Sequence, residues 1–242
     1  MKQIQIIKNF IKEELTGWKT WEISWLIACC IVLAAVSLHL KDTWMGITAA
    51  ITGNVYVICT GKGKRSAFIF GTVNVMLYAI ISWKAKFYGE VMLNTLYYLP
   101  MQFWGFYIWN KNLSATTHEV HKKRMTGKLR AIYASAIILA SVIYGLILKL
   151  IGGSLPYADA FTTAASVAAL LMSVKMYMEQ WIIWIAVDIL TIIMWGIACA
   201  TGNASSATLI MWICYLLNGI IMFIKWERES RNTAPDQPGK EI

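Results

Sequence analysis

The sequence predicts an all-α integral membrane protein with eight transmembrane helices. Of its 242 residues, 58% are apolar and 14% are charged, whereas soluble domains carry about 25% charged residues. Eight apolar segments follow one another along the chain, and Lys and Arg gather in alternate connections between them. These observations together indicate one helical transmembrane domain, residues 25–226, that spans the bilayer with a fixed orientation.

The eight apolar segments are short for membrane spans. A bilayer is normally crossed by ~20 apolar residues, and several segments have fewer. The first segment is the weakest of the series. The segments lie at residues 25–40, 44–60, 66–83, 88–109, 130–151, 158–178, 181–200 and 206–226.

Residues 1–24 precede the first segment and are predicted to form an amphipathic helix in the cytoplasmic interface. Between residues 2 and 16 one helical face is apolar, and lysines lie elsewhere; this face comprises Ile4, Ile7, Ile11 and Leu15. Tryptophans follow, as in an aromatic belt. A signal peptide is the alternative, but the charged leader is long and no small-x-small cleavage site follows.

The distribution of Lys and Arg predicts that both termini lie in the cytoplasm. With eight spans, 18 of the 22 basic residues fall on the cytoplasmic side, as the positive-inside rule requires. Seven spans would place the basic cluster that follows residue 226 outside. The polar tail, residues 227–242, is then a short cytoplasmic end without a fold of its own. The exceptions to the rule are Lys41, Lys84, Lys86 and Lys149.

A repeat relates segments two to four with segments six to eight. A shift of 117 residues aligns Tyr98 with Tyr215, and a shift of 114 sets Asn74 opposite Asp188. Two parallel three-helix bundles are therefore predicted, at residues 44–109 and 158–226, with a linker helix at 130–151 between them. In transporters of this plan the substrate binds between the halves, near the bilayer midplane.

A polar stripe runs along the predicted span at residues 88–109. Residues spaced by four stack on one helical face, and lipid offers such side chains no hydrogen-bond partner. We expect Asn94, Tyr98 and Gln102 to line a cavity, and Glu90 to face water. The alternative is a ladder of hydrogen bonds between helices.

Asp188 lies deep in the apolar segment 181–200. A carboxylate at this depth is costly unless it is partnered or hydrated, and such groups are functional by default. Trp181 and Trp184 precede it on the same helical face, and Asn74 is its counterpart in the repeat. The alternative is a structural role for both polar residues, since Asn commonly ties membrane helices together.

The last segment gives the second bundle a comparable polar and aromatic face, formed by Trp212, Tyr215 and Asn218. Tryptophan faces beside one carboxylate would suit a flat aromatic or cationic ligand. Each of these three residues taken alone is explained equally well by packing.

Other functional classes lack the residues that they need. The basic turn at 61–64 does not have the spacing of a phosphate-binding loop. His118 and His121 have no further metal ligands nearby in the sequence, and no nucleophile stands in a catalytic arrangement. The net charge of +9 resides in membrane-flanking loops, so nucleic acid is not an expected partner. We expect no enzyme activity, cofactor or metal.

The residues also resemble those of a known family. The run FYGEVMLNTLYYLPMQFWGFYIW at 87–109 resembles the PnuC family of vitamin transporters, as do LPYADA at 155–160 and EQWIIWIAVD at 179–188. The resemblance covers roughly residues 25–226. It implies two three-helix bundles and a linker helix, an arrangement similar to that of the SWEET sugar transporters. It also maps the ligand site onto residues of both bundles, namely Asn94, Tyr98, Gln102, Trp181, Trp184, Asp188, Tyr215 and Asn218. Met211 stands where the first bundle has Asn94, so the two halves cannot hold a ligand symmetrically.

The resemblance implies facilitated uptake of nicotinamide riboside through the bacterial inner membrane, with a cytosolic kinase that traps the product as its phosphate. The tryptophans would stack the ring, and Asn94 and Gln102 would bond the ribose hydroxyls. Related carriers for thiamine, riboflavin or a nucleoside are the alternatives, and Asp188 leaves proton coupling open. The sequence is compatible with a homo-oligomer and does not fix its size.

Overall fold

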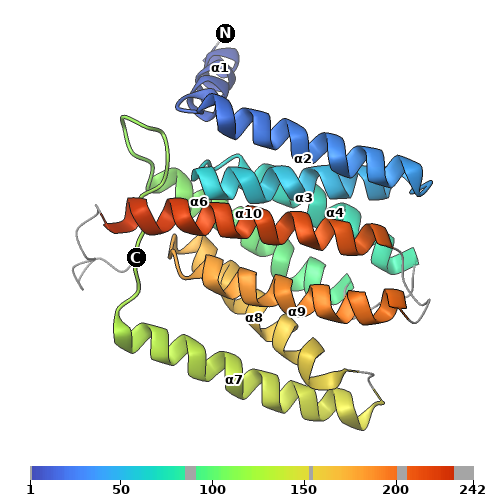
Figure 1. Ribbon diagram of the computed structural model, residues 1–242. Coiled ribbons are helices and arrows are strands. Elements are labelled where there is room, and N and C mark those ends of the chain that lie inside the picture. The colour runs from blue at the N-terminus through green and yellow to red at the C-terminus, as the bar shows by residue number, and fades with distance from the viewer. Residues whose placement is uncertain (1, 85–90, 153–154, 201–205, 232–242) are drawn as a thin grey trace. The chain divides into compact units, whose positions relative to one another are not determined.

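The computed structural model describes residues 2–84, 91–152, 155–200 and 206–231, and these ranges are helical apart from turns and two isolated bridges (Figure 1). The all-α prediction is thereby confirmed. Glu90 and the tail beyond residue 231 lie outside the described residues. The chain divides into two compact units, residues 1–121 and 122–242, which we call unit 1 and unit 2 and describe separately.

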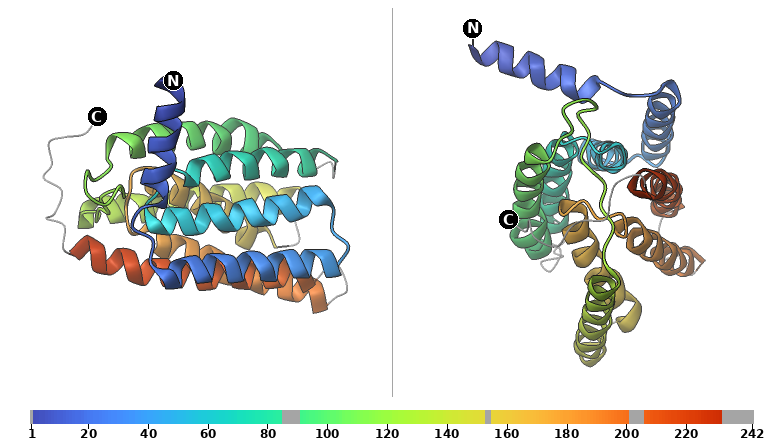
Figure 2. Two further views of the ribbon diagram at one scale, coloured as in Figure 1. Left: turned by 90° about the horizontal axis from the view of Figure 1, so that it is seen from above. Right: turned by 90° about the vertical axis from the view of Figure 1, so that its left-hand side faces the viewer.

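Unit 1 is a helical bundle preceded by one crossing helix. Its elements are α1 (Lys2–Leu15), α2 (Thr20–His39), α3 (Trp44–Lys62), α4 (Ala67–Lys84), the π-helix η1 (Leu93–Tyr98) and α6 (Leu99–Lys111). Helix α2 packs on α3, α3 on α4, and α4 on η1 and α6. Helix α1 crosses the direction of α2, α3 and α4 in two perpendicular views (Figures 1 and 2).

Two local devices set the ends of the unit 1 helices. Helix α2 begins five residues before the predicted segment, because the carboxylate of Glu22 accepts the backbone N–H of Lys19 (2.9 Å) and so caps the first turn. Helix α3 ends at Gly63, whose φ of +83° is the left-handed conformation of a glycine C-cap. The chain can therefore turn sharply from α3 into α4.

The core of unit 1 is aromatic at the end near this turn. Phe68 and Trp109, both fully buried, meet edge to face with ring centroids 4.9 Å apart. Gly105 makes this contact possible, since a Cβ at that position would collide with the ring of Phe68. Helix α6 is thus held close to α4, which fixes the predicted polar stripe relative to its neighbours.

Unit 2 consists of α7 (Gly127–Leu150), α8 (Pro156–Val174), α9 (Gln180–Ala200) and α10 (Ser206–Arg231). Helix α7 packs on α8, α8 on α9, and α9 on α10. The predicted linker helix is α7, and it contributes to the core of this unit rather than standing apart from it. The core cluster comprises Met125, Ile137, Ala165, Met172 and Val187.

Several helices have the length and apolar character of membrane spans. Within the described residues four meet both conditions, namely α2, α4, α7 and α8. The stretch Gln180–Met194 of α9 is apolar but shorter. Many large apolar side chains are exposed to the surroundings, among them Ile31, Leu139 and Ile193. Such surfaces suit lipid and not water.

Candidate functional site

The predicted polar stripe lies on a helix that changes its winding. In η1 the backbone N–H of Leu99 donates to the carbonyl of Asn94, five residues earlier, and regular α-helix resumes in α6. Residues four apart drift by about 40° per step around an α-helix, and the wider π turn offsets that drift. Asn94 and Gln102, at the two ends of the stripe, therefore lie closer to one line along the helix. Segments of π-helix occur frequently at functional sites.

The stripe is buried at both ends. Asn94 is 4% exposed and Gln102 is 2% exposed, while Tyr98 is half-buried beside Tyr97. The Gln102 amide lies against Gly71 of α4 and near the ring of Tyr56 on α3. Its Oε1 accepts no hydrogen bond from the described residues. A buried acceptor without a donor costs about 1–3 kcal/mol, so this oxygen is available for a ligand hydroxyl or a water.

Asn74 also takes part in a contact between helices. Its Nδ2 donates to the backbone carbonyl of Ala49 on α3 (2.7 Å), and its side chain is half-buried. This bond ties α4 to α3 within unit 1, as the structural alternative for this residue requires. The amide oxygen of Asn74 is not engaged by that bond.

In unit 2 the predicted polar residues gather where α9 meets α10. Asp188 is 4% exposed and Asn218 is fully buried. A Cβ at Gly219 would lie 3.7 Å from Oδ2 of Asp188, so the carboxylate lies against the backbone of α10. Glycine at this position lets the two helices approach around a polar group, as small residues do in membranes.

The predicted aromatic residues of unit 2 take three different positions. Trp181 meets Trp226 edge to face (centroids 6.0 Å apart), and its indole N–H finds no acceptor in the described part of the chain. Trp184 packs against the core cluster of α7 and α8. Trp212 and Tyr215 meet edge to face on α10 at 5.7 Å. Of the three residues predicted to share one helical face, Trp184 therefore packs in the core of unit 2.

Sequence reasoning did not single out Gln180, the first residue of α9. It is fully buried, and neither atom of its amide has a hydrogen-bond partner among the described residues. Its neighbour Glu179 accepts the backbone N–H of Met125 and the Nε of Arg130 (2.9 Å). A polar pair at the start of an apolar segment is the signal that could have identified both residues.

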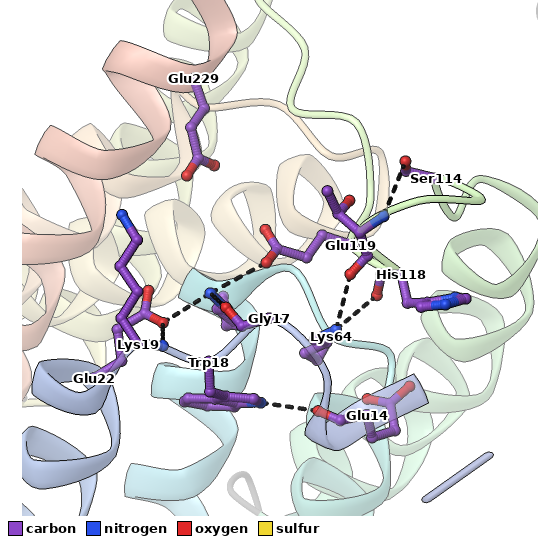
Figure 3. A network of polar contacts seen from close by, with 12 residues as sticks. Glu14, Gly17, Trp18, Lys19, Glu22, Lys64, Ser114, His118, Glu119 and Glu229 are labelled. Atoms are coloured by element: carbon purple, nitrogen blue, oxygen red, sulfur yellow. Dashed lines mark hydrogen bonds and ion pairs between the residues drawn. The ribbon is translucent and has the colours of Figure 1, made fainter. Parts of the chain in front are cut away.

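The basic turn after α3, predicted only as a loop, is an anchor point of unit 1 (Figure 3). The fully buried Lys64 donates to the carbonyls of Glu13, Thr117 and His118, at 3.0–3.2 Å. Lys62 lies between the carboxylates of Glu22 (2.7 Å) and Glu119 (3.2 Å). The turn thus joins the N-terminal segment to the loop that follows α6.

Comparison with known proteins decides the family. A family model described as "Nicotinamide mononucleotide transporter" matches residues 43–228. The nicotinamide riboside transporter PnuC of Neisseria mucosa is 36% identical over 222 residues, which cover 90% of this chain and 84% of that protein. The chain belongs to the PnuC transporter family. Its membership makes the protein a membrane transporter and not an enzyme.

Other PnuC proteins agree with this assignment along nearly the whole chain. The nicotinamide riboside transporter PnuC of Haemophilus influenzae is 29% identical over 92% of this chain and 96% of its own length. A crystal structure of the vitamin B3 transporter PnuC aligns with a TM-score of 0.79 at 36% identity, covering 92% of this chain and 97% of that one. The helical architecture of unit 1 and unit 2 is thus that of a PnuC transporter.

Proposed function

We propose that this protein carries nicotinamide riboside across the bacterial inner membrane by facilitated diffusion. The observation that supports this most directly is the buried Oε1 of Gln102, which accepts no hydrogen bond within the described part of the chain, on a helix that also buries Asn94. A ribose hydroxyl is a donor that fits such an acceptor. The same substrate is supported by the 36% identical relative, which is named a nicotinamide riboside transporter.

The membrane arrangement that we propose has eight spans and both termini in the cytoplasm. Helices α3, α4 and η1–α6 form one repeat, and α8, α9 and α10 form the other, as in SWEET-like transporters. The substrate would bind between the two repeats and be released by alternating access. A cytosolic nicotinamide riboside kinase would then trap it as its phosphate.

A calorimetric titration of the purified protein tests the substrate. Nicotinamide riboside is expected to bind, whereas thiamine and riboflavin are the competing ligands of related carriers. Absence of heat with nicotinamide riboside, together with saturable heat from either competitor, would reassign the transporter to that vitamin.

The role of the Gln102 acceptor is tested by Gln102→Met, which keeps the side-chain length and removes the amide. We expect nicotinamide riboside to bind about tenfold more weakly, equivalent to about 1.4 kcal/mol. Tyr107→Phe is the matched control, because Tyr107 is exposed on the same helix. Equal affinity of the two variants would remove Gln102 from the site.

Proton coupling is tested at Asp188, the buried carboxylate of α9. We expect counterflow of nicotinamide riboside in liposomes to be insensitive to a pH gradient, and Asp188→Asn to retain it. Uptake driven by an inward proton gradient, lost in Asp188→Asn, would establish a proton-coupled carrier instead.

In cells without the kinase, the initial rate of nicotinamide riboside uptake should persist while its accumulation is lost.

A further inference from the structure

Helix α1 crosses the bundle helices of unit 1 instead of continuing them. Figures 1 and 2 show α1 running across α2, α3 and α4, and the chain turns between α1 and α2 at Gly17, whose φ is +81°. Helices that span a membrane stand along its normal, so a helix across them lies near the membrane plane. The inference that α1 lies near the membrane plane rests on the proposed membrane arrangement and not on the proposed substrate.

One side of α1 is fastened to unit 1. Arg65, two residues before α4, forms ion pairs with Glu13 and with Glu14, the latter at 3.0 Å. Its guanidinium also lies over the ring of Phe10, 4.7 Å from the centroid, and that ring packs beside Phe106 of α6 at 6.3 Å. These contacts fix the rotation of α1 about its own axis, and therefore which residues point away from the bundle.

The side that points away is apolar. Ile4 and Ile7 are each 59% exposed, Ile11 is 50% exposed and Leu15 is 71% exposed. Lys8 and Lys12 directly follow Ile7 and Ile11, and both are exposed. Each lies about 100° further around the helix than its neighbour, which places the two lysines along the edge of the apolar stripe, opposite the edge held by Arg65.

We propose that α1 docks on the cytoplasmic leaflet of the membrane, with its apolar stripe at the headgroup–acyl boundary and its lysines on anionic headgroups. An apolar face bordered by lysines is the pattern of helices that lie in the membrane interface. The cytoplasmic leaflet carries the complementary negative charge. A second copy of the same face would bring like-charged lysine edges together, which disfavours it as the occupant.

Spin labels on the full-length protein in vesicles test this docking. The five cysteines are replaced by alanine, and a single label is placed by Ile7→Cys or Ile11→Cys. The control labels, Gln5→Cys and Asn9→Cys, occupy exposed polar positions on the same helix. In phosphatidylglycerol-containing vesicles, labels at 7 and 11 should collide several-fold more often with oxygen than with a water-soluble nickel chelate. Labels at 5 and 9 should show the reverse ratio.

The headgroup charge is tested by changing either partner. One test replaces phosphatidylglycerol with phosphatidylcholine, and the other introduces Lys8→Gln together with Lys12→Gln. Either change should make the labels at 7 and 11 collide more often with the chelate, relative to oxygen. The proposal is overturned if these labels meet the chelate as freely as those at 5 and 9, or if they are shielded from both reagents, which would indicate a protein partner. Collision rates do not depend on which vitamin binds, so the result stands apart from the proposed function.

Discussion

At Gly71 the lack of a side chain makes room for the amide of Gln102. A Cβ at this position would collide with Oε1 of Gln102 and lie 2.8 Å from the ring of Tyr56. We predict that Gly71→Ala displaces the Gln102 amide and weakens ligand binding at least tenfold, whereas helix propensity alone would favour Ala by about 1 kcal/mol. Calorimetric titration and thermal unfolding would measure the two effects separately.

Gly196→Ala is the matched control, because nothing in the described residues lies within 4 Å of a Cβ built at Gly196 of α9. This variant should bind ligand normally and unfold at the same or a slightly higher temperature. If Gly71→Ala binds as well as Gly196→Ala, then the position of the Gln102 amide does not matter for the ligand.

Glu227 gives unit 2 an acid-sensitive contact beyond the apolar segment that ends at residue 226. Hydrogen bonds from Arg231 and from Arg124 hold the pKa of Glu227 below its ordinary value of 4.5. A lowered carboxyl pKa stabilises the folded state above the ordinary pKa, and this stabilisation is lost as the pH falls through the lowered value. We therefore predict a drop in unfolding temperature below about pH 4.5 that is reduced in Glu227→Gln and retained in Glu13→Gln.

At the scale of residues, the sequence indicates which polar groups are buried but not what they touch. Asn94, Gln102, Asp188 and Asn218 were identified because a polar side chain in an apolar run must be shielded from lipid, and all four are buried. The packing of Trp184 and the space at Gly71 depend on neighbouring helices, which periodicity does not specify. The ligand contacts themselves remain a prediction.

At the scale of elements, the sequence predicted the connections between helices least well. The turn after α3 contains buried lysines, and Lys64 donates to three backbone carbonyls. Sequence patterns identify such a stretch as a basic turn because they count charge and not burial. The π-helix η1 was likewise missed, since its extra residue per turn leaves no mark in composition; only Pro100, which lacks a backbone N–H, hints at irregular winding there.

We predict that Lys64→Met weakens the contact between the N-terminal segment, the turn after α3 and the loop that follows α6. Removing the ammonium group that binds three partly buried carbonyls is expected to reduce the stability of unit 1 by on the order of 3 kcal/mol, and to speed hydrogen exchange in residues 112–121. Lys175→Met, at an exposed lysine in the corresponding turn of unit 2, is the control and should change neither. Exchange measured by mass spectrometry on the purified protein reports both; unchanged protection in Lys64→Met would mean that the carbonyls are hydrated without cost.

For the whole molecule, composition and charge predicted a helical membrane protein, whereas the transporter prediction rested on the repeat and on the family resemblance; family membership confirms that the protein is a membrane transporter. The number of spans and their orientation remain predictions, because a count of basic residues is a statistical rule and no membrane boundary is marked on the helices. The two related halves also remain a prediction: the chain divides into two compact units, and the predicted linker helix α7 packs within unit 2.

Labelling of single cysteines in intact cells tests the orientation. In a background without the five native cysteines, Lys41→Cys is expected to react with a membrane-impermeant maleimide from outside. Lys128→Cys should react only after the membrane is opened, and both positions are exposed. Labelling of Lys128→Cys in intact cells would contradict eight spans with both termini inside.

Arg65 and Glu179 occupy positions 114 residues apart, the same shift that pairs Asn74 with Asp188. Each is buried just before the second helix of its predicted bundle, and each binds a helix that precedes that bundle. Arg65 pairs with Glu13 and Glu14, and Glu179 pairs with Arg130. The two predicted halves thus make corresponding ion pairs with the charges reversed. If the predicted repeat holds, a protein built from two copies of one half would set like charges against each other at one of these contacts, so the two halves would not be interchangeable.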